Sequence, residues 1–209
     1  MNLLELPADV VLCAAGKSRN AEQILNAIDS GVKVIGMNYI QEAEQLISGL
    51  GAKAKAVEWH MIGHLQSNKV RKAVELFDMI QTVDSFKKAH LISTAAKGMQ
   101  KVMSVLIEVN IAKEDNKHGV FPEDVLNLAK EIIRLPNICL NGLMTMGPNV
   151  EEQQLRQYFR QANDLYQQLK TKAKDINILS MGMSSSYKAA IEEGSTMVRL
   201  GTILFGPRG

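Results

Sequence analysis

Two groups of residues at opposite ends of the sequence have side chains suited to binding one phosphorylated aldehyde. Lys17 follows the first apolar run, Val10 to Ala15, and a lysine at the carboxyl end of a buried strand can form an imine with an aldehyde. Ser184, Gly201 and Thr202 offer two hydroxyls and a close backbone approach, which suit a phosphate. A ligand carrying both groups would join the two ends of the chain in one site. Pyridoxal 5'-phosphate is the obvious candidate.

Lys17 also has a simpler interpretation, since a lysine at the end of a strand is most often a charged side chain exposed to solvent. The three residues before it, Ala14, Ala15 and Gly16, are small and leave room for a ring beside the strand. Burial at that position would favour the free amine that an imine requires. These neighbours strengthen the interpretation of Lys17 as a nucleophile, and a solvated charge stays the alternative.

The proposed phosphate-binding residues also have alternatives. Ser184 to Ser186 precede a predicted helix over Tyr187 to Glu193, and serines are favoured helix caps whether or not an anion binds there. Arg199 could be an ion-pair partner across the mouth of the fold. Either segment alone would be weak evidence for a phosphate site.

The elements that must position these residues alternate between strand and helix. Amphipathic or well-capped helices are predicted from Ala21 to Ser30, from Pro122 onward and from Glu151 to Lys174. Eight such units favour a single-domain (β/α)8 barrel over residues 1–209, with an open doubly wound sheet as the alternative. Function in these barrels gathers at the carboxyl ends of the strands. The short apolar runs predicted as strands are Val10–Ala15, Lys33–Asn38, Glu58–Gly63, Met79–Val83, Ser104–Asn110, Cys139–Met146, Asn177–Ser184 and Met197–Phe205.

The composition excludes several classes of protein. A formal net charge of +2 is too small to indicate binding to nucleic acid or to an anionic membrane. No stretch approaches the roughly 20 apolar residues that span a bilayer, and Met1 to Glu5 lack a secretory pattern. Cys13 and Cys139 are predicted to be small buried hydrophobes in a reducing cytoplasm.

A metal site is not expected from the spacing of the histidines. His60 and His64 are four residues apart, but they fall in a strand and its exit loop rather than on one helix face. That arrangement is poor for joint ligation, and no cysteine–carboxylate cluster completes a site.

Trp59 to Lys69, WHMIGHLQSNK, closely resembles the W-H-F-I-G-x-L-Q-x-N-K signature of the pyridoxal phosphate homeostasis protein family. The similarity covers almost the whole chain in the correct order. The resemblance implies a barrel like the alanine racemase N-terminal domain, bound pyridoxal phosphate, and a role in cofactor homeostasis without catalytic residues. Further matching stretches are Gly36–Glu42, Gly142–Met146, Leu179–Ser184 and Gly194–Gly206.

The resemblance also assigns roles in binding the cofactor. Lys17 would form the imine, Asn38 would lie beside the ring, and Arg199 would face the pyridine nitrogen. An arginine cannot accept a hydrogen bond from a pyridinium, so the ring nitrogen would stay largely unprotonated and the electron sink would be weak. The residues expected to bind pyridoxal 5'-phosphate are Lys17, Asn38, Ser184, Arg199, Gly201 and Thr202.

Four positions depart from the usual family pattern. Met37 stands where a glutamate is usual, which is expected to remove a carboxylate near the ring. Gly16 follows Ala15 where valine and serine are common, and Ser186 replaces an aspartate. These departures are expected to affect the affinity for the cofactor and leave the lysine, the phosphate-binding residues and the arginine in place.

Several functions remain open at this point. The first is a non-catalytic monomer that holds pyridoxal phosphate and delivers it to apo-enzymes. The main alternative is a minimal pyridoxal phosphate-dependent amino-acid racemase. A class I aldolase that uses Lys17 on a phosphorylated sugar is a further possibility, as is a regulatory module that binds an apo-enzyme or RNA through the basic helix around Lys69, Arg71 and Lys72.

Overall fold

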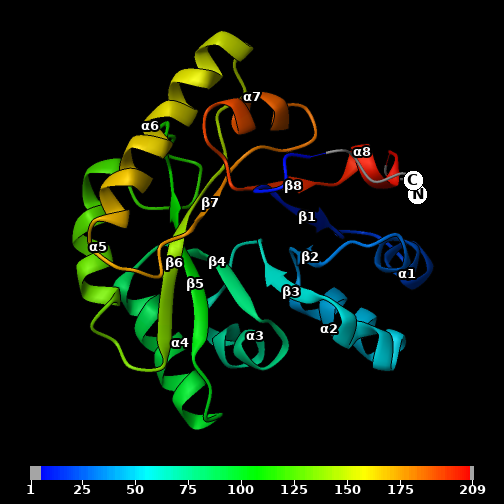
Figure 1. Ribbon diagram of the computed structural model, residues 1–209. Coiled ribbons are helices and arrows are strands. Elements are labelled where there is room, and N and C mark those ends of the chain that lie inside the picture. The colour runs from blue at the N-terminus through cyan, green and yellow to red at the C-terminus, as the bar shows by residue number, and fades with distance from the viewer. Residues whose placement is uncertain (1–5, 208–209) are drawn as a thin grey trace.

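The eight strands form one closed, parallel barrel in the computed structural model, which describes residues 6–207 (Figure 1). Each strand pairs with the next, and β1 (Val11–Ala15) closes the barrel against β8 (Met197–Leu200). The predicted (β/α)8 barrel is therefore confirmed, and the open sheet is wrong. Residues 1–5 and 208–209 of the predicted domain, and with them the segment tested for a secretory pattern, lie outside the described residues.

The other elements alternate along the chain as a barrel of this kind requires. The remaining strands are β2 (Val34–Met37), β3 (Glu58–Met61), β4 (Met79–Val83), β5 (Met103–Val109), β6 (Ile138–Thr145) and β7 (Ile178–Ser180). The α-helices are α1 (Ala21–Asp29), α2 (Ile40–Leu50), α3 (Val70–Leu76), α4 (Phe86–Gly98), α5 (Val125–Ile132), α6 (Glu152–Lys170), α7 (Tyr187–Glu192) and α8 (Thr202–Phe205). Short 3-10 turns span Gly51–Ala56, Ser67–Lys69 and Pro122–Asp124.

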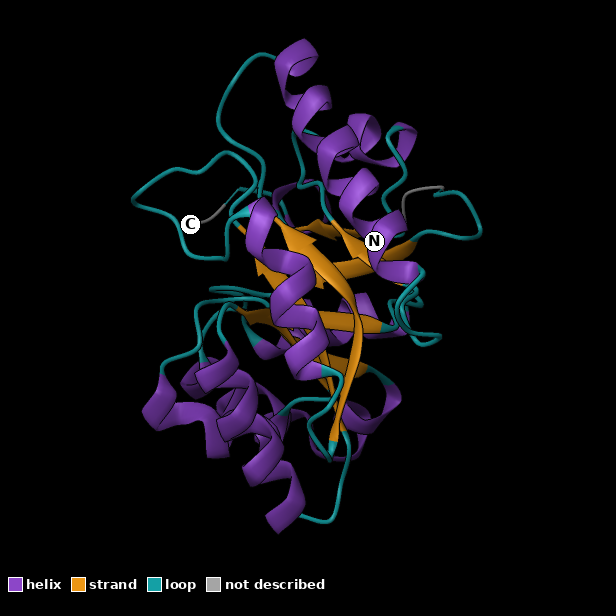
Figure 2. Ribbon diagram, turned by 90° about the vertical axis from the view of Figure 1, so that its left-hand side faces the viewer, coloured by secondary structure: helices purple, strands orange, loops and turns teal. Residues whose placement is uncertain are grey.

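The helices surround the strands, as Figure 2 shows. Helix α1 is stabilised both by a local cap and by packing against the barrel. Asn20 and Gln23 form a reciprocal cap at the start of the helix, and Ile24 and Ile28 are buried beneath it.

Among residues 6–207, no helix is both long and apolar enough to cross a membrane.

Alternate strand positions face two different environments. One face of each strand packs under the helices and contributes to the main hydrophobic core. The opposite face fills the inside of the barrel and carries both apolar and polar side chains. The apolar ones form two small clusters, Cys13, Val34 and Met197 in one, and Met79, Leu106 and Met144 in the other.

The last two strands are shorter than the apolar runs predicted. β7 ends at Ser180 rather than Ser184, because Gly182 adopts a φ of +92° that turns the chain out of the strand. β8 ends at Leu200 rather than Phe205, because Gly201 takes a helical conformation and starts α8. Cys139 is half-buried, so the prediction of a buried cysteine is correct for Cys13 only.

Arg19 joins the first loop of the barrel to the end of the last helix. Its guanidinium donates hydrogen bonds to the carbonyl oxygens of Gly206 at 2.7 Å and Pro207 at 3.2 Å. These carbonyls lie just after α8, and carbonyl oxygens at the end of a helix have no N–H donors within the helix. The two segments predicted to form one site are thus held together by a buried side chain.

Candidate functional site

A cavity of about 390 Å³ opens at the carboxyl ends of β1 and β8. Its volume is within the range typical of small-molecule sites. The structure brings together around it all of the residues predicted to bind the cofactor: Lys17, Asn38, Ser184, Arg199, Gly201 and Thr202. Their roles toward a ligand remain predictions.

Lys17 lies in the turn that directly follows β1. Its Nζ is 5.2 Å from the centre of the Tyr39 ring, a distance at which an ammonium is attracted to the face of an aromatic ring. The side chain is half-buried, so the desolvation expected from the apolar strand is only partial. The amine therefore reaches the cavity while staying accessible to a ligand from solvent.

The loops after β7 and β8 meet at the Ser184 hydroxyl. The backbone N–H groups of Gly201 and Ile203 donate to Ser184 Oγ over 3.2 and 3.4 Å. N–H groups in the first turn of a helix lack acceptors within the helix and carry partial positive charge. The same donors could therefore hold a phosphate oxygen beside the hydroxyls of Ser184 and Thr202.

Arg199 is buried in the wall of the cavity and is fixed by carbonyl oxygens. Its guanidinium donates to Ser180 O at 2.9 Å, to Ser180 Oγ at 2.7 Å and to Thr145 O at 2.9 Å. Burial lowers the pKa of Arg199, but an arginine remains protonated in proteins. The cavity therefore has a permanent donor in this wall.

A chain of polar contacts runs through the inside of the barrel from Glu58 to Arg199. Glu58 Oε2 lies 3.2 Å from His60 Nε2, and this contact lowers the pKa of Glu58. His60 Nδ1 is 2.9 Å from Gln81 Nε2, and Ser180 Oγ donates to Gln81 Oε1 at 2.8 Å. Arg199 completes the chain through its bond to Ser180 Oγ. His60 is thus a structural residue of the barrel interior and not a group at its mouth.

Asn38 is held at the mouth by an unusually close approach of two backbone segments. A Cβ atom built on Gly63 would lie 2.3 Å from Asn38 O and 2.7 Å from Asn38 Cα. Real Cβ atoms do not approach backbone atoms so closely, so only glycine permits this contact.

We expect Gly63→Ala to lower the melting temperature and to weaken cofactor retention, because Asn38 and its loop must move away from the new methyl group. The free energy of unfolding should fall by about 1–3 kcal/mol. Gly49→Ala is the matched control, since its Cβ would meet nothing within 4 Å and alanine is the better helix former. An unchanged melting temperature in Gly63→Ala alongside an unchanged control would contradict the close contact.

Met37 does not face the ring site, so the expected loss of a carboxylate from the cavity is wrong. Its side chain is fully buried in the core beneath the helices, because strand position 37 points away from the barrel interior. A Cβ on Gly16 would come within 2.9 Å of Met37 Sδ. Two of the departures from the family pattern, Gly16 and Met37, are therefore neighbours, and the glycine makes room for the methionine.

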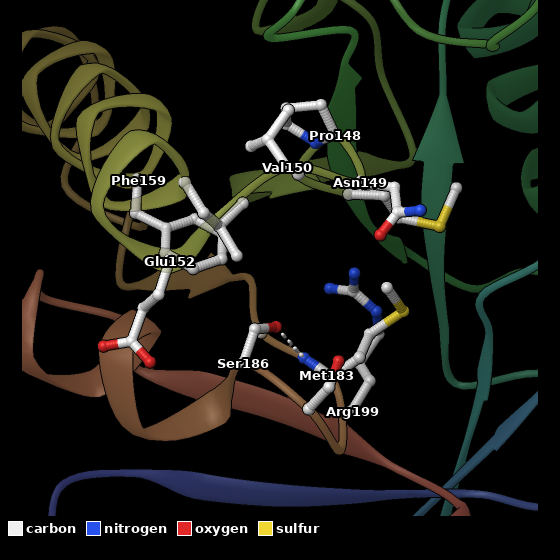
Figure 3. A pocket seen from close by; sticks show the side chains of 13 residues that line it. Pro148, Asn149, Val150, Glu152, Phe159, Met183, Ser186 and Arg199 are labelled. Atoms are coloured by element: carbon white, nitrogen blue, oxygen red, sulfur yellow. Dashed lines mark hydrogen bonds between the residues drawn. The ribbon is translucent and has the colours of Figure 1, made fainter.

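A second cavity of about 290 Å³ shares Arg199 with the first (Figure 3). Its walls come from segment 146–150, from Phe159 of α6 and from the loop around Met183. Ser186 Oγ accepts a hydrogen bond from Met183 N at 3.2 Å and so shapes this loop. None of these walls was predicted from the sequence. A signal for them existed in Gly147 and Pro148, which follow the strand end directly.

The chain forms a parallel barrel of the alanine racemase type with a cavity at its mouth. The family described as "Alanine racemase, N-terminal domain" matches residues 9–209. Alanine racemase of Clostridium difficile superposes with a TM-score of 0.81 at 18% identity, over 97% of this chain and 56% of that chain. At this identity the likeness concerns the fold alone.

More similar proteins define the family more narrowly. The pyridoxal phosphate homeostasis protein of Pasteurella multocida is 42% identical over 95% of this chain and 87% of its own. That of Escherichia coli K12 is 39% identical over 97% and 87%. PipY of Synechococcus elongatus, solved with pyridoxal phosphate bound, gives a TM-score of 0.88 at 33% identity, over 97% and 95%. This chain belongs to the pyridoxal phosphate homeostasis protein family.

Proposed function

We propose that this protein binds pyridoxal 5'-phosphate covalently through Lys17 and takes part in the intracellular homeostasis of that cofactor. The observation that carries the proposal is the single cavity in which Lys17 and the loops after β7 and β8 meet. The cofactor's aldehyde and phosphate are the two groups that a lysine and a cluster of backbone N–H donors recognise. A relative solved with the cofactor bound supports the same ligand.

The residues present fit the cofactor at each of its reactive positions. Lys17 supplies the amine, and the donors around Ser184 supply the anion site. Arg199 presents donors but no acceptor, so a pyridine nitrogen beside it is not stabilised in its protonated form. The bound cofactor supplies an electrophilic aldehyde and a π-system, and this arginine keeps that π-system a weak electron sink.

We infer from this arrangement that the protein is a cytoplasmic carrier of the cofactor and not an enzyme. The names of the relatives support the same role, since they describe homeostasis and no reaction. In this proposal the protein acts as a monomeric, single-domain barrel, and apo-enzymes that need pyridoxal phosphate are the recipients.

We expect the double variant Ser184→Ala, Thr202→Val to retain pyridoxal phosphate at least ~10-fold less tightly than the unmodified protein, since hydrogen bonds to charged groups contribute about 1.5–3 kcal/mol each. Retention is measured as the fraction of cofactor left on the protein after exhaustive dialysis. The covalent link at Lys17 should still form. Thr94→Val, on the exposed side of α4, is the control. Equal retention in the double variant and the control would place the phosphate elsewhere.

A further inference from the structure

Three side chains with metal-binding atoms meet at the mouth of the barrel, on the loops after β3, β4 and β5. They are His64, Asp84 and His118, and one ligand atom from each lies within 4.8 Å of the others. The two imidazole rings stack, with their centroids 3.7 Å apart and their planes inclined by 16°. Both histidines are exposed and Asp84 is half-buried, so an ion could enter from solvent.

We propose that His64, Asp84 and His118 bind a divalent transition-metal ion of the Zn²⁺ type. Zinc binds imidazole nitrogen and carboxylate oxygen at roughly 2.0–2.2 Å, so two ligand atoms of one ion lie roughly 3.3 Å apart. The ligand atoms lie within 4.8 Å of one another here, so the proposal requires the two exposed imidazoles to rotate until their nitrogens reach that separation. Two imidazoles select Zn²⁺, Ni²⁺ or Cu²⁺ over Mg²⁺ and Ca²⁺, which prefer all-oxygen sites. Three protein ligands leave coordination positions open to water.

Two neighbours already orient the Asp84 carboxylate, one at each oxygen, and each oxygen keeps a further lone pair. Ser85 Oγ donates to Asp84 Oδ1 at 3.1 Å, and the buried Lys88 Nζ lies 2.6 Å from Oδ2. Hydrogen-bonded supports of this kind fix the ligands of metal sites. The positive charge of Lys88 also opposes a cation, so we expect weaker binding than at a closed structural zinc site.

The loop that carries His118 is fixed by Asn110, at the end of β5. The Asn110 side chain donates to Glu114 O at 2.8 Å and Lys117 O at 3.2 Å, and it accepts from Glu114 N at 3.0 Å. Gly119 then passes so close that a Cβ would lie 2.6 Å from Asn110 N. These contacts place the adjacent His118 over the loop after β3, so the meeting of the two histidines follows from the backbone.

The proposed ion site is separate from the Lys17 site but close to it. His64 lines a cavity of about 350 Å³ that also includes Asn38, and Asn38 lines the larger cavity with Lys17. The expectation of no metal considered His60 and His64 alone, and His60 is indeed turned into the barrel interior. His118 lies 54 positions further along the chain than His64, so no short-range spacing indicated that the two would meet.

The test is a titration of the full-length, tag-free protein, free of pyridoxal phosphate, with ZnCl₂ in a calorimeter. We expect one equivalent to bind, and His64→Ala and His118→Ala each to weaken binding by 10-fold or more. The control is His90→Ala, an exposed histidine on α4 that stacks on Phe86 and should leave binding unchanged. Added Zn²⁺ should raise the melting temperature of the unmodified protein but not that of the two site variants.

Absence of stoichiometric binding would overturn the proposal. So would equal binding by the unmodified protein, His64→Ala and His118→Ala, because the ion would then lie elsewhere. The titration contains no cofactor, so its failure would leave the proposed binding of pyridoxal phosphate unaffected.

Discussion

Alanine at position 17 is expected to abolish the visible absorption band that the protein acquires when it is mixed with pyridoxal phosphate. The band requires a C=N bond between Lys17 Nζ and the aldehyde carbon, and alanine has no amine to form it. The phosphate-binding loops are unchanged in this variant, so cofactor should still bind, weakly and reversibly. The measurement is an absorption spectrum recorded before and after gel filtration.

Two controls separate this covalent link from charge and from unspecific reaction. Lys17→Arg keeps the positive charge near Tyr39 but cannot form the bond, so it should lose the band as alanine does. Lys69→Ala removes a lysine from the neighbouring cavity and should keep the band. A full-strength band in Lys17→Ala would show that another lysine carries the cofactor and would refute the proposed site.

Removal of the Glu108 carboxylate is expected to produce the second large effect, a change in how stability depends on pH. Glu108 lies on β5, is almost fully buried, and has no hydrogen-bond partner for Oε2 among residues 6–207. Its pKa is raised from 4.5 to about 7, chiefly by burial and also by the nearby Asp84 carboxylate, against the lowering effects of Lys88 and Arg199. The folded protein therefore holds this proton more tightly than the unfolded chain does.

The sign of the effect follows from proton linkage. Between pH 4.5 and pH 7 the folded state binds more protons than the unfolded state, so stability falls as the pH rises through this window and then levels off. The total contribution is at most about 3 kcal/mol. Glu108→Gln should remove this slope and be more stable than the unmodified protein at pH 8. Urea unfolding at a series of pH values measures it.

The control for this prediction is Glu131→Gln, an exposed glutamate at the end of α5 whose replacement should leave the pH profile unchanged. If Glu108→Gln is less stable than the unmodified protein at pH 8 and keeps the slope, then folding does not raise the pKa of Glu108, and its carboxylate must have a partner.

The barrel and its site could be predicted because both follow from local patterns. Apolar runs alternating with amphipathic segments define a parallel barrel, and its strand ends share one face. Lys17 and Thr202, 185 positions apart, were therefore predicted to lie close together, and in the structure both line one cavity. Their chemical roles still depend on the spectra and variants described above.

Other features depend on which way a strand side chain points, and the sequence does not give this directly. Met37 was assigned to the ring site although it points under the helices. No role was predicted for Gln81, which lies in an apolar run. A glutamine among buried residues nevertheless indicates a polar partner inside the barrel. The approach of His118 to His64 depends on the path of a long loop, which no short motif encodes.

The chain of polar contacts behind Arg199 also has a consequence for recognition. Its guanidinium cannot swing toward an incoming molecule without leaving Ser180, and through Ser180 it would disturb Gln81 and His60, both inaccessible to water. The Arg199 side chain is therefore already ordered in the folded protein, and binding of a ligand does not have to order it. Ring-shaped ligands of the wrong outline should be rejected by a rigid template rather than accommodated by induced fit.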